Sequence, residues 1–269
     1  PYLIPGHRYI FKTAKKDWQA QQMWSEVVAY RIACLANLRA PPCFAAVDRS
    51  TGEVGVLMEF FFSYPGEKVT PRLAHGGDVL ARYIADRKRG RPHGVKTNVS
   101  AARAYKVPRA VEWWGEALVF DALIANVDRH PDNWAFLVVA GEQQTYSMAP
   151  LFDNGTSLGY GITDAKLAES DIDTLLTPFA ARGLHHCGWD ESDDKRGAHV
   201  ALVARFAATY PRAIGAMQNV IRFDIGAVES IVTGLIQFQT GVPFTAERAQ
   251  FILALIAKRQ DELAEVLGL

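Results

Sequence analysis

The sequence predicts an α+β protein of two lobes, a small strand-rich N-lobe over residues 1–65 and a larger, mostly helical C-lobe over residues 66–269. Strand patterns surround a single helical pattern in the first 65 residues, and helical patterns dominate from about residue 76. A long apolar helix pattern also leads directly into a charged loop. We expect the two lobes to form one domain, because 269 residues are enough to bury a large core.

Four elements are expected in the N-lobe: a strand over 8–12, a helix over 17–35, and strands over 44–47 and 54–62. Asp17 is a favourable cap for the helix, whose apolar residues recur at helical spacing, and Pro41-Pro42 follow its end. The turn Asp48–Gly52 joins the last two strands. The lobe is therefore predicted to be a small sheet with one helix.

The C-lobe is predicted from the same kinds of pattern, with a polar loop that contains glycine and proline early in the lobe. Its expected elements are a helix over 79–85, the loop over 89–100, a helix over 111–126, a hairpin of 135–140 and 144–148, and helices over 164–182, 197–217, 226–237 and 245–267.

The bulk composition is that of an ordinary globular protein, with 49% hydrophobic and 22% charged residues. The 29 basic and 29 acidic residues balance, so we expect no nucleic-acid binding and no attraction to anionic membranes. Three widely spaced cysteines indicate a reducing compartment, and a cytoplasmic protein is expected. There is no apolar run of 18 residues and no signal peptide.

The segments 126–134 and 149–155 contain the pattern that points to chemistry. Asn133 lies five positions after Asp128, and Asp153 lies 25 positions after Asp128. This is the spacing used in phosphoryl transfer from ATP. Asp128 is predicted to accept the proton of an attacking hydroxyl. Asn133 and Asp153 are predicted to hold Mg²⁺ through an amide oxygen and a carboxylate. Asp-Asn-Gly is also a good turn former, but the three residues together favour a metal site.

Residues beside this pattern add to the prediction. Asp153 follows an apolar Pro150-Leu151-Phe152, which places it at a strand end, and Gly155 is expected to allow a sharp turn. His130 is close enough to Asp128 to reach a γ-phosphate or the acceptor, or else is a locally bonded loop histidine. Arg129 is a candidate anchor of the loop, through pairing with a carboxylate.

A lysine–glutamate pair is predicted in the N-lobe. Lys12, at the end of the first strand, is expected to neutralise the α- and β-phosphates, and Glu26 on the next helix is expected to hold the lysine in place. The alternative is two surface charges, with Lys15 and Lys16 as rival lysines. Residues 57–61 lie between the lobes, where a hinge binds adenine through its backbone; a plain core strand is the alternative.

Two further clusters are interpreted as structural. His185-His186-Cys187 and His199 lack the spacing of a zinc site, so a loop with a stray cysteine is expected. The basic stretch 87–91, with Lys96, is either a basic mouth for a phosphoinositide or, as we expect, a solvated loop.

The strings Asn-Val-Asp-Arg-His-Pro-Asp-Asn-Trp and Ala-Pro-Leu-Phe-Asp-Asn resemble those of the HipA-like kinase family, bacterial toxin and effector kinases related to the phosphoinositide 3/4-kinase fold. The resemblance covers about residues 8–160, and it includes the stretch His75-Gly76-Gly77-Asp78. It implies a two-lobed protein-kinase-like fold and a protein serine/threonine kinase that uses ATP and Mg²⁺. It further implies a protein substrate and a separate small partner protein of the antitoxin type, with export as an effector left open.

The resemblance also implies a set of site residues. These are Asp128 as catalytic base, with His130 and Lys12 beside it, Asn133 and Asp153 for Mg²⁺, Lys12 and Glu26 for the ATP phosphates, and the backbone of Glu59, Phe60 and Phe61 for adenine.

One departure from the family pattern is the missing glycine-rich loop before Lys12, where only Pro5-Gly6-His7 stand. Because the chain begins with Pro1, we expect that this loop was lost with the natural N-terminus or that a short, glycine-poor loop serves instead. Two other functions stay open: a lipid or small-molecule kinase that uses the same site, and a nucleotide-binding pseudokinase.

Overall fold

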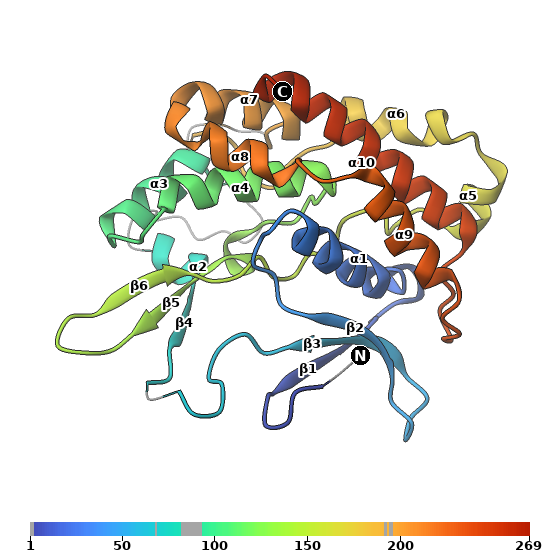
Figure 1. Cartoon of the computed structure of the whole chain (residues 1–269), viewed down its shortest axis with the longest axis horizontal. Helices are drawn as coiled ribbons and strands as arrows, with labels where there is room; N and C mark the ends of the chain where they lie inside the picture. The colour runs from blue at the N-terminus through green and yellow to red at the C-terminus, as the bar shows by residue number, and fades with distance from the viewer. Residues whose placement is uncertain (1–2, 68, 82–92, 191–192, 194–195) are drawn as a thin grey trace.

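The N-lobe is built on an antiparallel sheet of three strands, β1 (Tyr9–Thr13), β2 (Cys43–Val47) and β3 (Val54–Glu59), in the order β1-β3-β2. The computed structural model describes residues 3–67, 69–81, 93–190, 193 and 196–269. Helix α1 (Gln22–Leu35) packs against β2 and β3 and lies between the sheet and the helices of the C-lobe (Figure 1). The predicted small sheet with one helix is therefore confirmed.

The strand register decides which side chains face α1. Lys12 lies opposite Val56, and Ile10 lies opposite Met58. Directly opposed residues point to the same side of a sheet, so Lys12 and Ile10 share the face on which Val56 and Met58 are buried. The short strand β1 thus directs a lysine toward the space between the lobes.

A second antiparallel sheet opens the C-lobe, with β4 (Arg72–His75), β5 (Ala135–Val139) and β6 (Thr145–Met148) in that order. The hairpin of β5 and β6 agrees with the prediction. Strand β4 was not predicted, because four residues carry no clear alternation and their partner β5 is about 60 residues away.

Helix α4 (Ala110–Leu123) is the centre of the C-lobe and packs against several neighbouring helices. Nearly all its side chains are buried, which explains the apolar density of its sequence. The other helices are α2 (Gly76–Leu80), α3 (Val95–Ala104), α5 (Asp164–Glu169), α6 (Ile172–Arg182), α7 (His199–Thr209), α8 (Ile214–Val220), α9 (Ile225–Ile236) and α10 (Ala246–Leu267). The predicted α+β fold with a mostly helical C-lobe is confirmed.

Several predicted boundaries in the C-lobe were wrong. Part of the expected loop 89–100 is helix α3, whose Val95, Val99 and Ala102 form a buried stripe at helical spacing. The expected helix 164–182 is divided, because Asp171 caps a new helix with its side chain. The expected helix 197–217 is also divided, where Pro211 begins a short 3-10 turn.

Three predictions in and near the N-lobe also need correction. Asp17 does not cap α1, because residues 17–19 form a separate 3-10 turn and the helix starts at Gln22. Strand β3 ends at Glu59 rather than at residue 62, and the rings of Phe60 and Phe62 pack together in an irregular segment. The helix predicted over 79–85 corresponds to α2, which begins at Gly76 and ends at Leu80; residues 82–85 of the prediction lie outside the described part of the chain.

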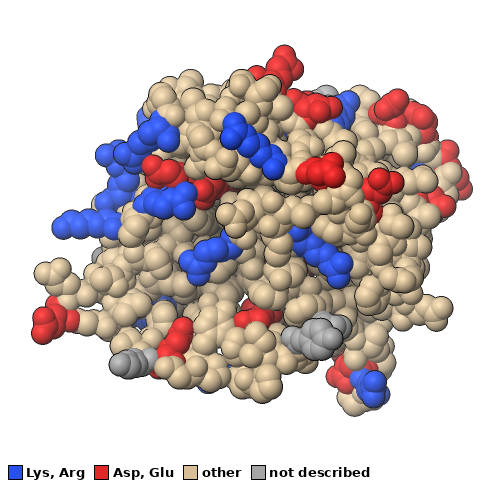
Figure 2. All heavy atoms as spheres, in the orientation of Figure 1, with Lys and Arg blue, Asp and Glu red and all other residues tan. Residues whose placement is uncertain are grey.

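The surface carries both signs of charge. Figure 2 shows Lys and Arg side chains gathered mainly on the left of the view, over the side of α3 and α8, and Asp and Glu side chains mainly on the right, over the side of α5 and α10. Within the described residues, no helix is both long and apolar enough to cross a membrane.

Candidate active site

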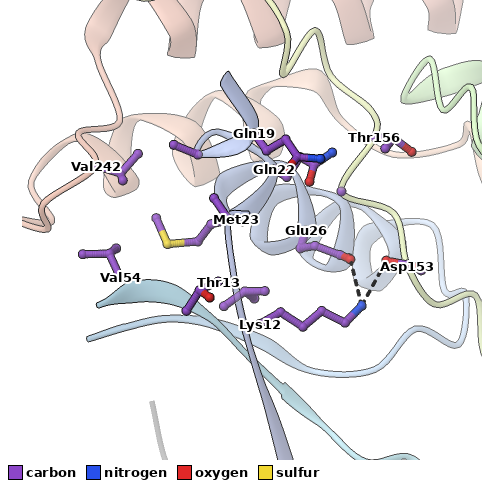
Figure 3. A pocket seen from close by; sticks show the side chains of 14 residues that line it. Lys12, Thr13, Gln19, Gln22, Met23, Glu26, Val54, Asp153, Thr156 and Val242 are labelled. Atoms are coloured by element: carbon purple, nitrogen blue, oxygen red, sulfur yellow. Dashed lines mark hydrogen bonds and ion pairs between the residues drawn. The ribbon is translucent and has the colours of Figure 1, made fainter. Parts of the chain in front are cut away.

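Lys12 is held between two carboxylates that come from different parts of the chain (Figure 3). Its Nζ atom lies 3.0 Å from Asp153 Oδ1 and 3.9 Å from Glu26 Oε1. Burial alone lowers the pKa of Lys12, but the charges of Asp153 and Glu26 outweigh burial and raise it. Lys12 is therefore a fixed positive charge at the junction of the lobes.

Glu26 links the sheet, α1 and the segment after Asp153. Its side chain is buried, and its Oε2 accepts a 3.0 Å hydrogen bond from the backbone N–H of Asn154. Burial raises the pKa of Glu26 to about 7, while Lys12 acts in the opposite direction. A Cβ atom at Gly155 would lie 3.2 Å from the Gln22 carbonyl oxygen, so an alanine there would require α1 or the loop to give by a few tenths of an ångström.

Asp153 was predicted at a strand end with its turn at Gly155, and both details were wrong. Strand β6 ends at Met148, and Asp153 lies in a loop with its own backbone in the left-handed region, at a φ of 58°. Aspartate enters this region more readily than most residues, at a cost of about 1 kcal/mol or more. The turn at Asp153 points its carboxylate toward Lys12.

Asp128 and Asn133 lie on the loop that follows α4. The Asn133 side chain donates a 2.8 Å hydrogen bond to the Asp128 carbonyl oxygen, which closes the loop into a tight curve. In the described part of the chain, no donor is bonded to Asn133 Oδ1, so this oxygen has no hydrogen bond there. Burial raises the pKa of Asp128, and His130 opposes this effect.

Arg129 joins the two loops that carry the polar residues. Its guanidinium is completely buried and forms two hydrogen bonds to Asp121, of 3.0 Å and 2.7 Å. It also donates to the carbonyl oxygens of Asn133 and Phe152 and to the side chain of Asn154. One cation thus fixes the loop of Asp128 relative to the loop of Asp153, as expected for an anchor.

His130 lies at the edge of this loop and is partly exposed. Its Nδ1 atom accepts a hydrogen bond from the Asp132 N–H, so Nε2 is the nitrogen that faces Asp128, at 4.0 Å from Oδ2. The ring is therefore both a local cap and a neighbour of the carboxylate, and the two alternatives for His130 are compatible.

The segment expected to bind adenine has two of its amides engaged within the protein. The Glu59 N–H donates to the Pro42 carbonyl, and the Phe60 N–H donates to the Arg8 carbonyl. Among the described residues, no acceptor is bonded to the Phe61 N–H, so this is the donor left for a ligand. The Glu59 side chain contacts His7 at 2.9 Å rather than the cavity near Lys12.

An aromatic wall stands beside this segment. The Phe61 ring stacks on Phe152 at 5.4 Å, and Phe60 packs on Phe62. Ile10 is 41% exposed although it shares the inner face of β1 with Lys12, so it offers an apolar surface on that face. Sequence reasoning missed Ile10, and its position two residues before Lys12 was the available signal.

A cavity of about 130 Å³ lies beside the Lys12 pair, between the sheet and the first half of α1 (Figure 3). Met23, Val54 and Val242 give it apolar walls, and Gln19 and Gln22 add polar groups. The lysine, Glu26 and Asp153 form its other end, so it is continuous with the site.

Sequence reasoning also missed the groups that support the site from behind. Asp121 accepts hydrogen bonds from Arg129 and lies 3.1 Å from His185. His199 donates a hydrogen bond to the Asn126 carbonyl. Burial alone would raise the pKa of Asp121, but Arg129 and His185 hold it below its usual range. Among the described residues, no group of three or more histidines, cysteines and carboxylates is arranged to hold a metal ion.

The fold and these contacts define the class of the protein: a two-lobed, kinase-like α+β protein with its polar groups at the junction of the lobes. The chain belongs to the HipA-like kinase family, since the model of the HipA-like C-terminal domain matches residues 5–214. The predicted family resemblance is confirmed.

The solved structures that share the fold include the following two. The Helicobacter pylori proinflammatory kinase CtkA is similar with a TM-score of 0.78 at 19% identity, over 98% of this chain and 90% of that one. The Shewanella oneidensis MR-1 toxin HipA, solved with HipB and operator DNA, is similar with a TM-score of 0.59 at 14% identity, over 98% of this chain and 59% of that one. No curated protein matches the sequence.

Proposed function

We propose that this member of the HipA-like kinase family is an ATP- and Mg²⁺-dependent protein serine/threonine kinase. The observation that carries the proposal is the convergence of Lys12, Asp153, Asp128 and Asn133, which Arg129 ties together from behind. Phosphoryl transfer depends on positioning and on the neutralisation of charge, and this arrangement supplies both. We propose that residues 1–65 and 66–269 act as the two lobes of one kinase domain.

The donor atoms suit magnesium. The free amide oxygen of Asn133 and the Asp153 carboxylate are hard oxygen ligands of the kind that Mg²⁺ prefers. Bound between them, Mg²⁺ would neutralise and align the phosphates of ATP. Lys12 would add its fixed charge to the α- and β-phosphates, and Glu26 would keep the lysine in place.

The reaction then needs one more group. As the acceptor hydroxyl oxygen bonds to the γ-phosphorus and the bond to the β-phosphate oxygen breaks, Asp128 would accept the hydroxyl proton and ADP would leave. Burial raises the pKa of Asp128, which makes it a better base than an exposed aspartate. His130, close to the same carboxylate, would steer it or the γ-phosphate.

For adenine we propose the hinge of Glu59, Phe60 and Phe61, with the free Phe61 amide as its donor. Ile10 and the ring of Phe152 would form the apolar sides of the slot. The basic stretch 87–91, the sequence feature that favours a lipid substrate, lies outside the described residues, so it adds no support for that alternative.

The setting of the reaction is also a proposal. The three cysteines are free, and two of them are buried, which suits the reducing cytoplasm. We propose a small antitoxin-type protein as partner, because HipA of Shewanella oneidensis was solved together with HipB.

The decisive experiment incubates the purified chain with γ-labelled ATP and Mg²⁺, with and without a generic protein acceptor, beside Asp128→Asn. We expect acid-stable label on protein with the wild type and a loss of at least ~100-fold with Asp128→Asn. Asp132→Asn removes a carboxylate from the same loop and serves as the matched control, with activity unchanged.

Three other outcomes would overturn the proposal. Label that appears in phosphoinositide vesicles instead of protein would identify a lipid kinase. Mg²⁺-dependent ATP binding without transfer to any acceptor would identify a pseudokinase. Full activity in Asp128→Asn would remove the proposed base.

A further inference from the structure

The segment His185-His186-Cys187 runs beneath the loop of Asp128, although the sequence suggested only a loop with a stray cysteine. Backbone bonds fix it on both sides, since His185 N–H donates to Gly197 O at 2.8 Å and Val95 N–H donates to Gly188 O at 3.0 Å. All three side chains are buried. A buried run of two histidines and a cysteine beside a charged loop calls for a role.

His185 contacts Asp121, the carboxylate that pairs with Arg129. Its Nδ1 atom accepts a hydrogen bond from the Cys187 N–H at 3.0 Å, and a backbone N–H can only donate. The proton of a neutral His185 ring is therefore on Nε2, which lies 3.1 Å from Asp121 Oδ2. His185 is therefore directed at Asp121 and is one of the partners of that carboxylate.

His186 faces the opposite way, toward Asp128. Its Nδ1 atom lies 3.9 Å from Asp128 Oδ1, while the other carboxylate oxygen faces the partly exposed His130. The His186 ring packs edge-on against the ring of His130, at 5.8 Å between centroids. His186 thus approaches the carboxylate from the protein interior, and His130 approaches it from the solvent side.

The far side of His186 is closed by a neutral histidine. The His93 ring lies 5.7 Å from the His186 ring, and its Nε2 atom accepts from the Trp134 N–H at 3.3 Å. Burial and the neighbouring histidines hold the pKa of His93 well below its usual value. Because His93 is backed by Trp134, the His186 ring has little room to move away from Asp128.

We infer that His186 is a positioning residue for Asp128: its Nδ1 holds one oxygen of the carboxylate and turns the other toward the acceptor hydroxyl. The inference rests on the proposed function, since it assigns a support to the proposed base. A separation of 3.9 Å exceeds a hydrogen bond, but such contacts at active sites often tighten only when the substrates are bound. A displaced base loses rate strongly even over ~1 Å.

Two substitutions separate positioning from simple packing. His186→Phe keeps the ring and its volume but removes both nitrogens, and His186→Asn places an amide N–H near the Nδ1 position but removes the ring. Positioning predicts a kcat lowered ~10- to 100-fold in His186→Phe, an unchanged KM for ATP, and recovery of most of that loss in His186→Asn. A wild-type kcat in His186→Phe, or a loss in His186→Asn as large as in His186→Phe, would overturn the inference.

A second measurement does not depend on turnover or on the stability of a His186 variant. The ¹⁵N NMR signals of the histidine rings are compared between the wild type and Asp128→Asn. We expect the His186 signals to shift and those of His185, which face Asp121, to stay in place. Unchanged His186 signals would refute the contact. A wild type that transfers no phosphate would refute the proposed function instead, while the NMR comparison still decides whether His186 senses Asp128.

Discussion

The Arg129 guanidinium stays charged in the protein interior because the atoms that it contacts are hydrogen-bond acceptors. Asp121 neutralises it, and three further oxygens accept its remaining N–H groups. A buried guanidinium without such partners would cost several kcal/mol. What the buried ion pair provides is a fixed position of the two loops relative to each other, rather than a gain in the free energy of unfolding.

The buried histidines make stability depend on pH, and His199 is one of them. Burial lowers its pKa to about 3, against about 6.5 in the unfolded chain. Between these values the unfolded chain binds a proton that the folded protein does not. The free energy of unfolding therefore falls as the pH drops below 6.5, by up to about 1.4 kcal/mol per pH unit for this residue.

We predict that His199→Gln weakens this dependence, because the Gln amide donates to the Asn126 carbonyl, as His199 does, without titrating. Urea denaturation at pH 7 and pH 5 measures the effect. The loss of stability between the two values should be smaller in the variant by about 2 kcal/mol. Equal losses in both proteins would show that His199 does not titrate as described.

At the scale of elements, the approach of α1 to the loop of Asp153 depends on Gly155. A Cβ atom there would lie 3.2 Å from the Gln22 carbonyl oxygen and 3.3 Å from Glu26 Cγ. We predict that Gly155→Ala lowers the free energy of unfolding by about 1–2 kcal/mol and weakens ATP binding, because it pushes Glu26 away from Lys12.

Gly161→Ala is the matched control, since nothing lies within 4 Å of a Cβ atom at that position of the same segment. Its stability should stay within about 0.5 kcal/mol of the wild type. Thermal unfolding and titration with ATP and Mg²⁺ give both quantities. If the Gly155→Ala protein behaved like Gly161→Ala, a Cβ atom at residue 155 would fit beside α1 without displacing the helix.

Some helices and strands could be predicted from the sequence, and others could not. Long apolar patterns predicted α4 and α10 well, and the β5–β6 hairpin was clear from local alternation. Helix α3 was missed because its glycine- and proline-bearing approach masked a short buried stripe. A four-residue strand such as β4 is defined by a distant partner, and local patterns carry no information about that partner.

The residues of the proposed site also fall into two groups, those that the sequence indicated and those that it did not. Lys12, Asp128, Asn133 and Asp153 stand in short strings whose spacing is fixed by chemistry, so the sequence points to them. Asp121, His185 and His186 act through contacts made across 8 to 64 residues of chain, and each type is commonplace in isolation. Only the folded chain brings them behind the loop.

At the scale of the whole molecule, α1 connects the N-lobe to the end of the chain. The Trp24 indole donates to the Val242 carbonyl at 3.0 Å, and its ring packs on Phe244 at 5.3 Å. Gln21 donates to the Pro243 carbonyl at 3.2 Å. The helix that carries Glu26 is therefore fastened by residues more than 200 positions away.

We predict that Phe244→Ala lowers the free energy of unfolding by about 3–5 kcal/mol, because it leaves a cavity beneath Trp24. Phe238→Ala, on the nearby exposed surface, should change it by less than about 0.5 kcal/mol. Chemical denaturation of the two variants tests this pair. A small effect of Phe244→Ala would mean that the segment does not fasten α1.

This fastening has a consequence for control. Many switchable proteins keep an inactive resting position by swinging one helix outward, and such a swing here would break the contacts of Trp24 and Gln21 at once. Glu26 would then leave Lys12 only with partial unfolding. If the proposed function holds, we expect control to act on the amount of the protein or through another protein that covers the site, rather than through a movement of α1.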